Sequence, residues 1–300
     1  MYIEPINQDR ILFPKILSKR LNTTHKKACG KVFIIAGSRN MTGAATLTCR
    51  AAMRSGAGYV ALAFPEKLNN IYRELLLEAI TIPCSQTEDG TFSEDALDIL
   101  IKKSKGYDVV ALGPGLSNNK ETDELIRRFI QKVEKPLIID ADGLNAIKND
   151  VNILKKIKKK TIITPHPGEM ARLSGLTVNE IQRDRDEVAR KYAKEWNVII
   201  VLKGYHTVIA HPDGRTIVNM TGGPALATAG TGDVLLGVIS ALWADNIKKP
   251  LDATATAVYL HGLAGDVVAE KIGEKSVIAS DVIDILPDVI KIAQEKINAK

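Results

Sequence analysis

Residues 31–64 of the chain read KVFIIAGSRNMTGAATLTCRAAMRSGAGYVALAF. The stretch holds an apolar run at Lys31–Ala36, a helical pattern at Ala44–Ser55 and a second apolar run at Val60–Phe64. Apolar and polar residues hardly alternate within the two runs, as is typical of strands that are covered on both faces. A strand, a helix and a second strand in this order predict a right-handed βαβ unit with parallel strands.

The same succession of short apolar runs and helical patterns continues along the chain. Further strands are predicted at Val109–Gly113, Pro136–Asp140, Thr161–Thr164 and Val198–Lys203. Helices are predicted at Thr122–Val133, Val178–Glu195, Gly232–Trp243, Asp252–Lys271 and Ser280–Asn298. An antiparallel hairpin is predicted from His206–Ala210 and Arg215–Asn219, which flank the turn residues Asp213-Gly214. We therefore expect one α/β domain over residues 1–300, with a mostly parallel sheet and helices on both faces.

Composition limits the classes of partner and the compartment. The net charge of +6 favours anionic partners in general, but the positive residues are scattered. The densest run, Lys155–Lys160, is interpreted as a solvated helix end, so no nucleic acid partner is predicted. The three cysteines form no CxxC pair and are expected to be buried, reduced thiols. No stretch has the roughly eighteen apolar residues of a membrane span, and Met1–Arg20 lacks the apolar core of a signal peptide. A cytoplasmic protein without a membrane partner is expected.

Glycine-rich or polar segments follow five of the predicted strands. They are Gly37–Ala45, Gly113-Pro114-Gly115, Asp140–Asn145, Pro165–Glu169 and Lys203-Gly204. Ligands bind open α/β sheets at the carboxyl ends of the strands. Because parallel strands end at one edge, we expect these segments to line one continuous cleft.

The strongest local signal is the run Ala227–Leu235, ATAGTGDVL, in which small residues lead into an apolar helix. Amides at a helix N-terminus bind phosphate, and Gly230 and Gly232 allow a phosphate to approach the backbone closely. Asp233, in the first turn, is placed either to cap the helix or to act as a base toward an incoming hydroxyl, and the residues leave both open. The run matches neither a Walker A loop nor a Rossmann fingerprint.

Four further residues are candidates for the site. Three of them have both a functional and a structural interpretation, and the fourth has mainly a structural one. Lys203 either meets a phosphate or is a surface lysine. Glu169 and His166 either lie near a water-mediated Mg²⁺ or are a helix N-terminal charge and a hydrogen-bonded loop histidine. His261 is interpreted mainly as a packing residue, because it and Asp266 are five positions apart and share no helix face well.

Taken together, the five strand-end segments and Gly230–Asp233 resemble the ADP- or ATP-dependent NAD(P)H-hydrate dehydratase family. The combination of the Asp140–Asn145, His166–Glu169 and Gly230–Asp233 segments makes the resemblance specific, and it extends over residues 26–291. One departure is visible at Gly222–Ala227, which reads GGPALA where many members have a Gly-Asn-Pro-Gly-Met-Ala run. Members are often fused to an N-terminal epimerase domain. Only about thirty residues precede the first predicted strand, so a stand-alone form without that domain is expected.

The resemblance implies a ribokinase-like three-layer fold, a homotetramer, Mg²⁺, and ADP or ATP as a co-substrate. It implies as substrates NADHX and NADPHX, which are NADH and NADPH hydrated at C6 of the nicotinamide ring. In the implied reaction Asp233 takes the proton of the C6 hydroxyl, which attacks the β-phosphate of ADP. AMP leaves, and the phosphorylated hydrate then eliminates phosphate.

The resemblance also implies the roles of individual residues. The hydrate site is expected to be lined by Ala44, Gly115, His166 and Asp233. The AMP part is expected to contact Lys203, Gly204, Tyr205, His206, Thr207 and Gly232. The charge on the transferred phosphoryl group is expected to be stabilised by the amides of Ala229, Gly230, Thr231 and Gly232. Glu169 is expected to help hold Mg²⁺ through water.

Two other functions are weighed against this one. A ribokinase-like small-molecule kinase, such as a hydroxyethylthiazole kinase, shares the phosphate-binding turn and the aspartate base, but its product keeps the phosphate. The Asp140–Asn145 and His166–Glu169 segments argue for the dehydratase. A non-catalytic nucleotide sensor is disfavoured by the intact Gly230–Asp233 run. The sequence leaves open the choice between ADP and ATP and between NADHX and NADPHX.

Overall fold

A computed structural model describes residues 16–298, and within them the strands form one nine-stranded sheet. The strands lie in the order β3-β2-β1-β4-β5-β6-β7-β8-β9. Strands β1 to β7 pair in parallel, and β8 and β9 extend the sheet as an antiparallel hairpin. The strand bounds are β1 Lys31–Ile35, β2 Tyr59–Pro65, β3 Ile80–Cys84, β4 Val109–Leu112, β5 Leu137–Ile139, β6 Thr161–Ile163, β7 Ile199–Leu202, β8 Val208–Ala210 and β9 Thr216–Val218.

Helices connect most of the strands and complete the C-terminal third. The α-helices are α1 Thr42–Arg54, α2 Asn69–Leu75, α3 Leu97–Ser104, α4 Lys120–Lys132, α5 Ala141–Ile147, α6 Ile153–Lys156, α7 Pro167–Ser174, α8 Val178–Arg183, α9 Arg185–Trp196, α10 Thr231–Asp245, α11 Pro250–Ile272 and α12 Ala279–Asn298. Short 3₁₀ turns are η2 Lys26–Ala28, η3 Glu66–Leu68, η4 Glu94–Ala96, η5 Pro224–Leu226 and η6 Glu274–Ser276.

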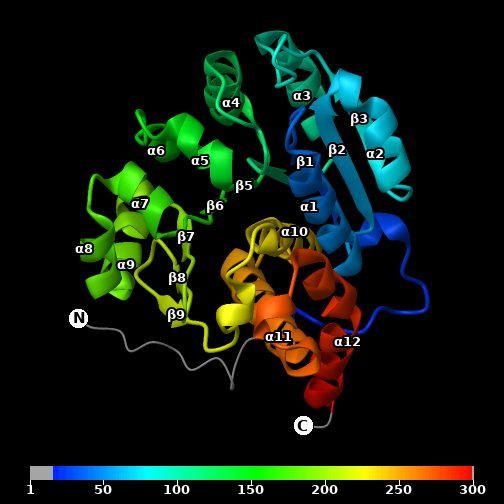
Figure 1. The fold of residues 1–300 in the computed structure, drawn as a ribbon, viewed down its shortest axis with the longest axis vertical. Coiled ribbons are helices and arrows are strands. Elements are labelled where there is room, and N and C mark those ends of the chain that lie inside the picture. Colours follow the sequence, from blue (N-terminus) through cyan, green and yellow to red (C-terminus); the bar gives the residue numbers. More distant parts are fainter. Residues whose placement is uncertain (1–15, 299–300) are drawn as a thin grey trace.

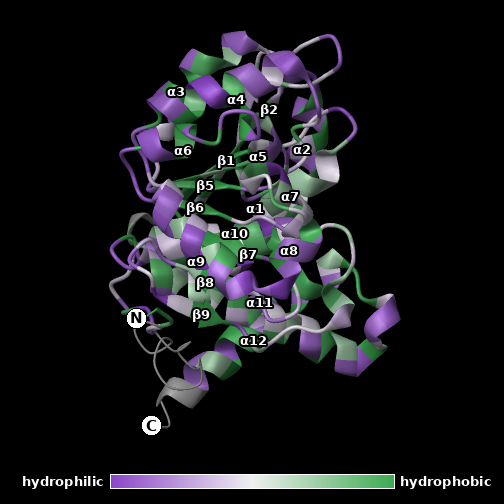
Figure 2. Ribbon diagram, turned by 90° about the vertical axis from the view of Figure 1, so that its left-hand side faces the viewer, coloured by the Kyte–Doolittle hydropathy of each residue, from purple (hydrophilic) through white to green (hydrophobic). Residues whose placement is uncertain are grey.

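The sheet separates two hydrophobic cores, which makes the fold three-layered. Val32 and Ile34 of β1 belong to the core shared with α1, α2, α10, α11 and α12, whereas Phe33 and Ile35 belong to the core shared with α3 to α9. Figure 1 shows the strands between these two groups of helices. In Figure 2 the strands are hydrophobic in the interior, while the outer helices carry hydrophilic residues. Strands covered on both faces explain the unbroken apolar runs.

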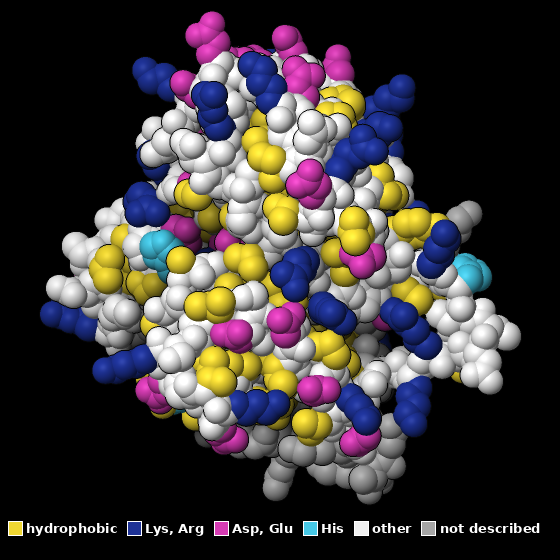
Figure 3. Space-filling model, turned by 45° about the vertical axis from the view of Figure 1, so that its right-hand side comes forward, with side chains coloured by type: hydrophobic (Ala, Val, Ile, Leu, Met, Phe, Trp, Pro, Cys, Tyr) yellow, Lys and Arg dark blue, Asp and Glu magenta, His cyan; other side chains and the backbone are white. Residues whose placement is uncertain are grey.

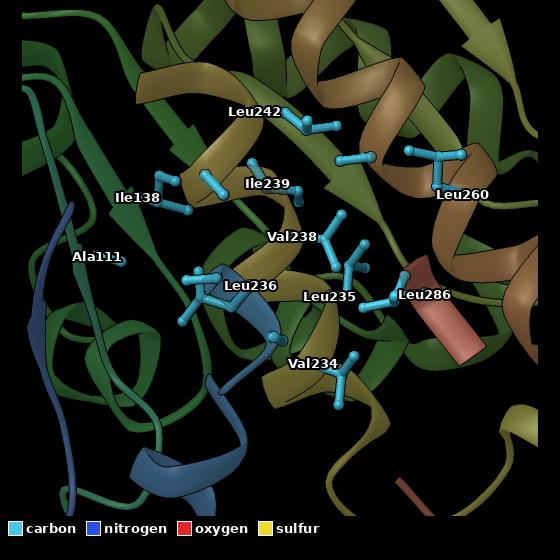
Figure 4. Packing of buried hydrophobic residues seen from close by; sticks show 14 of the residues in the cluster. Ala111, Ile138, Val234, Leu235, Leu236, Val238, Ile239, Leu242, Leu260 and Leu286 are labelled. Carbon is cyan, nitrogen blue, oxygen red and sulfur yellow. The ribbon is translucent and has the colours of Figure 1, made fainter. Parts of the chain in front are cut away.

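Helix α10 lies at the centre of the first core. Twelve of its fifteen residues are buried, and it is apolar on every side, as expected of a helix without a solvent face. Figure 4 shows its Val234, Leu236 and Ile239 packed among Ala111 and Ile138 of the sheet and leucines of α11 and α12. A buried helix holds its N-terminus rigidly, and that N-terminus is the Gly230–Asp233 turn.

The predicted mostly parallel α/β fold is confirmed, but three element predictions are wrong. Strand β3 was not predicted, because it is a short edge strand interrupted by Pro83, whose missing N–H is tolerated at an edge. The helix predicted at Val178–Glu195 is two helices, since Asp184 leaves the helical conformation and its side chain accepts a hydrogen bond from the Glu187 amide. The hairpin strands are shorter than predicted, although the Asp213-Gly214 turn is present.

Several predictions from composition can be compared with the described residues. Cys29, Cys49 and Cys84 are buried free thiols, as predicted. The lysines at positions 155–160 are exposed around the end of α6, which confirms the solvated helix end. On the face shown in Figure 3, basic and acidic side chains are interspersed. Between residues 16 and 298 no helix combines the length and the apolar character that crossing a membrane requires. Most of the Met1–Arg20 segment lies outside the described residues.

Candidate active site

A buried ion cluster lies where β5, β6 and β7 end. The Lys203 ammonium is 2.7 Å from a carboxylate oxygen of Asp140 and 3.7 Å from one of Glu169. Burial by itself would lower the pKa of Lys203, but the two carboxylates together raise it, so the lysine is cationic. The interpretation of Lys203 as an ordinary surface lysine is therefore wrong. It joins three strand ends and presents one positive charge to the edge of the sheet.

Asp233 lies beside this cluster in the first turn of α10. Its side chain is half-buried and makes no hydrogen bond with any residue between 16 and 298. Burial, followed by the negative charge of Asp140, raises the pKa of Asp233 to about 7, although Lys203 opposes the shift. Gly230 is the N-cap residue, so the interpretation of Asp233 as the helix cap is not supported. A carboxylate with this pKa can accept a proton near neutral pH.

The turn before α10 has the geometry of an anion site. Gly230 adopts a left-handed φ of 91°, and the first helical hydrogen bond runs from the Val234 amide to the Gly230 carbonyl. The amides of Thr231, Gly232 and Asp233 thus precede the hydrogen-bonded part of the helix. The Thr231 hydroxyl lies 2.9 Å from the Leu226 carbonyl and 3.0 Å from that of Thr228, which fixes the turn. Free amides and the helix dipole favour phosphate at this position.

His166 and Glu169 cap helix α7. The Nδ1 atom of His166 accepts hydrogen bonds from the amides of Gly168 and Glu169, and the Glu169 carboxylate accepts one from the His166 amide. Burial and the positive charge of Lys203 lower the pKa of His166, so the ring is neutral. Burial raises the pKa of Glu169, which Lys203 opposes. The structural interpretation of both residues is thus correct locally, and it also places them beside Lys203.

A cavity of about 370 Å³ opens next to Lys203 and Gly232. Of the residues predicted to contact nucleotide, it is lined by Lys203, Gly204, Tyr205, Thr207, Thr231 and Gly232. His206, Ala229 and Gly230 are outside the lining, although the His206 ring stacks on the ring of Tyr205. Arg185 donates to the carbonyls of Tyr205 and His206 and so holds this loop. Only one of the five strand-end segments, Lys203-Gly204, borders the cavity.

The rest of the cavity lining was not predicted from the sequence. It comes from the loop after β9, from Leu235 of α10, and from Val258, His261 and Gly262 of α11. His261 is more than a packing residue, because its Nε2 atom lies 2.9 Å from the Thr231 carbonyl. Burial lowers the pKa of His261 to about 4, so the neutral ring donates to that carbonyl. The only sequence signal for this part of the lining was the segment Gly222–Ala227, which departs from the run found in many family members.

Ala44 and Gly115 lie together where the loop after β4 meets helix α1. A Cβ atom on Gly115 would be 3.2 Å from the Cβ of Ala44, so the loop after β4 packs on the first turn of α1. Leu47 of the same helix reaches Gly230 in the phosphate-binding turn. A second, polar hollow of about 540 Å³ lies beyond, lined by residues that include Ser38, Arg39 and Ser117. The single continuous cleft predicted from the sequence is therefore not observed. Lys203-Gly204 borders the first cavity and Gly37–Ala45 borders the polar hollow, whereas the other three strand-end segments border neither.

Comparison with known families identifies the family of the chain. The family profile described as NAD(P)H-hydrate dehydratase matches residues 32–288. The chain belongs to this family.

Two relatives illustrate the range of similarity within the family. The chain is 43% identical over 281 residues to a bifunctional NAD(P)H-hydrate repair enzyme of Moorella thermoacetica, which covers 94% of this chain and 53% of that protein. It is 35% identical over 275 residues to an ADP-dependent (S)-NAD(P)H-hydrate dehydratase of Bacillus subtilis, which covers 92% of this chain and 94% of that protein. The chain thus spans about half the length of the bifunctional relatives it matches.

Solved structures support the same fold. An ADP/ATP-dependent NAD(P)H-hydrate dehydratase from Bacillus subtilis, co-crystallised with ATP/Mg²⁺, superposes with a TM-score of 0.78 and 33% identity over 94% of this chain and 96% of that one. A ribokinase-like superfamily protein from Enterococcus faecalis superposes with a TM-score of 0.82 and 26% identity over 97% of this chain and 100% of that one. The ribokinase-like fold is therefore confirmed. A hydroxyethylthiazole kinase from Pyrococcus horikoshii, at 17% identity over 89% of this chain and 92% of that one and a TM-score of 0.61, shares the fold alone.

Proposed function

We propose that the chain catalyses the ADP-dependent dehydration of NADHX and NADPHX to NADH and NADPH, with release of AMP and phosphate. The observation that carries the proposal is Asp233, a half-buried carboxylate that makes no hydrogen bond with any described residue and whose pKa is raised to about 7. It stands between the amides of a phosphate-binding turn and a cluster containing Lys203. The family's relatives are named for this reaction, and two of them are named as ADP-dependent.

The reaction follows from replacing a poor leaving group by a good one. Asp233 accepts the proton of the C6 hydroxyl as that oxygen attacks the β-phosphorus of ADP. The bond between the β-phosphorus and the bridging oxygen breaks, and AMP leaves with the bonding electron pair. The phosphorylated ring then loses phosphate and a proton as its double bond reforms. The amides of Ala229, Gly230, Thr231 and Gly232 stabilise negative charge on the transferred group.

In this proposal the nucleotide occupies the cavity beside Lys203 and Gly232. The AMP part contacts Lys203–Thr207, and either ADP or ATP serves as the donor. The hydrate lies toward Ala44, Gly115 and His166, so that its hydroxyl meets Asp233. Lys203 supports the anionic nucleotide, because its charge lies close to the turn: a Cβ on Gly232 would be 3.6 Å from the Lys203 nitrogen.

We also propose that Mg²⁺ arrives with the nucleotide. No group of three or more His, Cys, Asp and Glu side chains in the described part of the chain is arranged to hold a metal ion. Mg²⁺ commonly keeps several waters and combines one or two carboxylates with phosphate oxygens. Glu169, next to Lys203 at the phosphate side, fits as a water-mediated contact of that kind. The ion would neutralise phosphate charge when it is bound.

The cellular setting is part of the proposal as well. Three free, buried thiols are compatible with a reducing compartment, and we propose a cytoplasmic enzyme.

The homotetramer implied by the family resemblance stays a prediction, and size-exclusion chromatography with light scattering measures it. Small-molecule substrates are the partners that the site is built to hold.

An absorbance assay tests the proposed reaction. Purified chain is mixed with NADHX or NADPHX and with ADP or ATP, and the reduced-nicotinamide band is followed over time. We expect the band to appear with a nucleotide present, together with AMP and phosphate when ADP is the donor. A kinase of the hydroxyethylthiazole type would instead leave a stable phosphate ester and no band. Nucleotide binding without any product would support the sensor.

A further inference from the structure

The outer wall of the nucleotide cavity is a loop that packs on helix α11. We call residues 219–226 the cavity wall; six of them line the cavity, namely Asn219, Thr221, Gly222, Gly223, Pro224 and Leu226. Within the wall, the side-chain amide Nδ2 of Asn219 donates a hydrogen bond to the Thr221 carbonyl at 2.8 Å. The wall also reaches the phosphate-binding turn, because the Thr231 hydroxyl donates toward the Leu226 carbonyl. Its position therefore affects both the cavity and the turn.

Helix α11 approaches the wall without side chains in between. A Cβ atom on Gly262 would lie 2.3 Å from the Thr221 hydroxyl and 2.6 Å from the Thr221 carbonyl oxygen. A Cβ on Gly265 would lie 2.7 Å from the side chain of Leu226. The Thr221 hydroxyl is 2.9 Å from the Tyr259 carbonyl. The wall thus rests directly on the helix backbone, where any displacement opens or narrows the cavity.

One charged side chain of α11 binds the backbone of the wall. A carboxylate oxygen of Asp266 accepts a hydrogen bond from the Gly222 amide at 2.9 Å. Gly222 has a left-handed φ of 91° and belongs to no helix or strand, so no regular backbone hydrogen-bond pattern holds it. A hydrogen bond to an ionised acceptor is stronger than one between neutral groups. Asp266 is the one carboxylate between residues 16 and 298 that holds this amide.

We propose that Asp266 is a positioning residue for nucleotide binding: it fixes the cavity wall through the Gly222 amide without touching the nucleotide. The proposal rests on the proposed function for the identity of the ligand. It concerns a segment in which this chain departs from the sequence run of many family members. His261 and Asp266, five positions apart, then act from one helix on two parts of the same cavity, the turn and the wall.

The test compares three variants by calorimetry with ADP and with ATP and by steady-state kinetics. Asp266→Ala removes the acceptor and should raise the nucleotide Kd and KM about tenfold while kcat changes little. Asp266→Asn keeps an acceptor oxygen of the same reach and should restore most of the affinity. Glu270→Ala is the control. Glu270 lies one turn further along α11, beside the outer side of the wall, and its side chain makes no hydrogen bond with described residues, so this substitution should leave the nucleotide Kd unchanged.

Hydrogen exchange gives a second measurement that does not depend on activity. Amides of residues 219–226 should exchange faster in Asp266→Ala, while those of β1 and β4 keep their protection, since only the wall is released. If Asp266→Ala is too unstable to study, Asp266→Glu takes its place. The side chain is longer by one methylene, so the carboxylate no longer sits at its present position beside the Gly222 amide, and nucleotide binding should weaken as in Asp266→Ala.

Three results would overturn the inference. They are an unchanged nucleotide Kd in folded Asp266→Ala, an equal loss in Asp266→Asn and Asp266→Ala, and an equal loss in Glu270→Ala. Failure of the proposed function looks different, because then the unsubstituted chain produces no reduced-nicotinamide band in the absorbance assay, whether or not it binds ADP or ATP. In that case hydrogen exchange still decides whether Asp266 holds the wall.

Discussion

Asp233 is the residue on which the proposed chemistry depends. Its neighbours make the carboxylate a weak acid: burial and the charge of Asp140 raise its pKa, while Lys203 keeps the shift from going further. Since the side chain makes no capping hydrogen bond, its carboxylate has no structural task in the turn. Catalysis and local stability can therefore be separated by substitution.

Asp233→Asn should abolish most turnover while the protein stays folded and binds nucleotide. The amide cannot accept the hydroxyl proton, and loss of general-base catalysis costs roughly 10²–10⁴-fold. Nucleotide binding should be equal or tighter, because one negative charge near the phosphates is removed. A thermal melt and a turnover assay on one preparation measure both properties. Near-normal rates in a folded variant would refute the catalytic role.

Lys203→Ala should have two effects, because the lysine is paired with two buried carboxylates and lies beside the nucleotide cavity. Stability should fall by about 3 kcal/mol, since Asp140 and Glu169 lose their cation. Nucleotide affinity should fall about tenfold to a hundredfold. Urea unfolding measures the first effect and calorimetry the second.

A double variant separates these two effects of Lys203. Asp140→Asn combined with Lys203→Ala should recover part of the stability, because it also removes the unpaired carboxylate, but none of the affinity. Recovery of affinity in the double variant, or unchanged affinity in the single one, would contradict a direct role of the Lys203 charge.

At the scale of the elements, the contact between α1 and α10 positions the turn. Gly237 of α10 faces α1 so closely that a Cβ would lie 2.4 Å from the Thr48 carbonyl oxygen and 2.7 Å from the Cβ of Ala51. The two helices are therefore in backbone contact. Because the first turn of α1 carries Ala44 and that of α10 carries Asp233, this contact sets the spacing of the two halves of the site.

Gly237→Ala should destabilise the fold and lower activity together. The added methyl forces the helices apart, and overpacking of this kind costs about 1–3 kcal/mol. Gly43→Ala is the matched control, because a Cβ there meets no atom within 4 Å and the residue already lies in helix α1. Urea denaturation compares the two. Equal stabilities would mean that the α1–α10 spacing adapts freely and does not position the site.

At the scale of the whole molecule, the fold collects charges at one edge of the sheet. Strands β5, β6 and β7 end at the same level, so Asp140, Glu169 and Lys203 converge although they are far apart in the chain. With Asp233 added, three carboxylates face one ammonium. Burial, together with the negative charge of Asp140, raises the Asp233 pKa to about 7, and the single ammonium of Lys203 opposes this only in part.

The pH dependence of the rate follows from this field. The base must be ionised, so kcat/KM should rise with pH through about 7 and level off above it. Asp140→Asn removes a charge that raises the Asp233 pKa, so the rise should move to lower pH. Rates measured across the acid and neutral range check both statements. A rise at the same pH in Asp140→Asn, or rates independent of pH, would contradict them.

Stability should respond in the opposite direction. The Asp233 pKa is about 7 in the folded chain and 3.8 ordinarily, so the stability contributed by its protonated form is complete below pH 3.8 and is lost as pH rises through 7. Asp233→Asn removes that loss, and above neutral pH its stability should be at least that of the unsubstituted chain in urea unfolding.

The sequence by itself determined the class of fold and the kind of site. Continuous apolar runs predict covered parallel strands, since only strands buried on both faces need no polar side. The Gly230–Asp233 run before an apolar helix predicts an anion-binding turn, because its conformation depends on residues that are neighbours in the chain. The strand-end segments were placed at one edge correctly, because parallel strands end at the same edge of a sheet. Strand β3 was not predicted, because it is an edge strand that pairs with β2 alone.

Only the tertiary structure decided which side chains meet. Lys203 pairs with Asp140 across 63 positions, Asp266 binds Gly222 across 44, and His261 reaches Thr231 across 30. Such contacts depend on strand order and on how closely helices approach, and local patterns carry no information on either. The cavity wall and its support on α11 therefore emerged from packing. The physical reason is that backbone conformation is set by near neighbours, whereas an active site is assembled from residues that folding brings together.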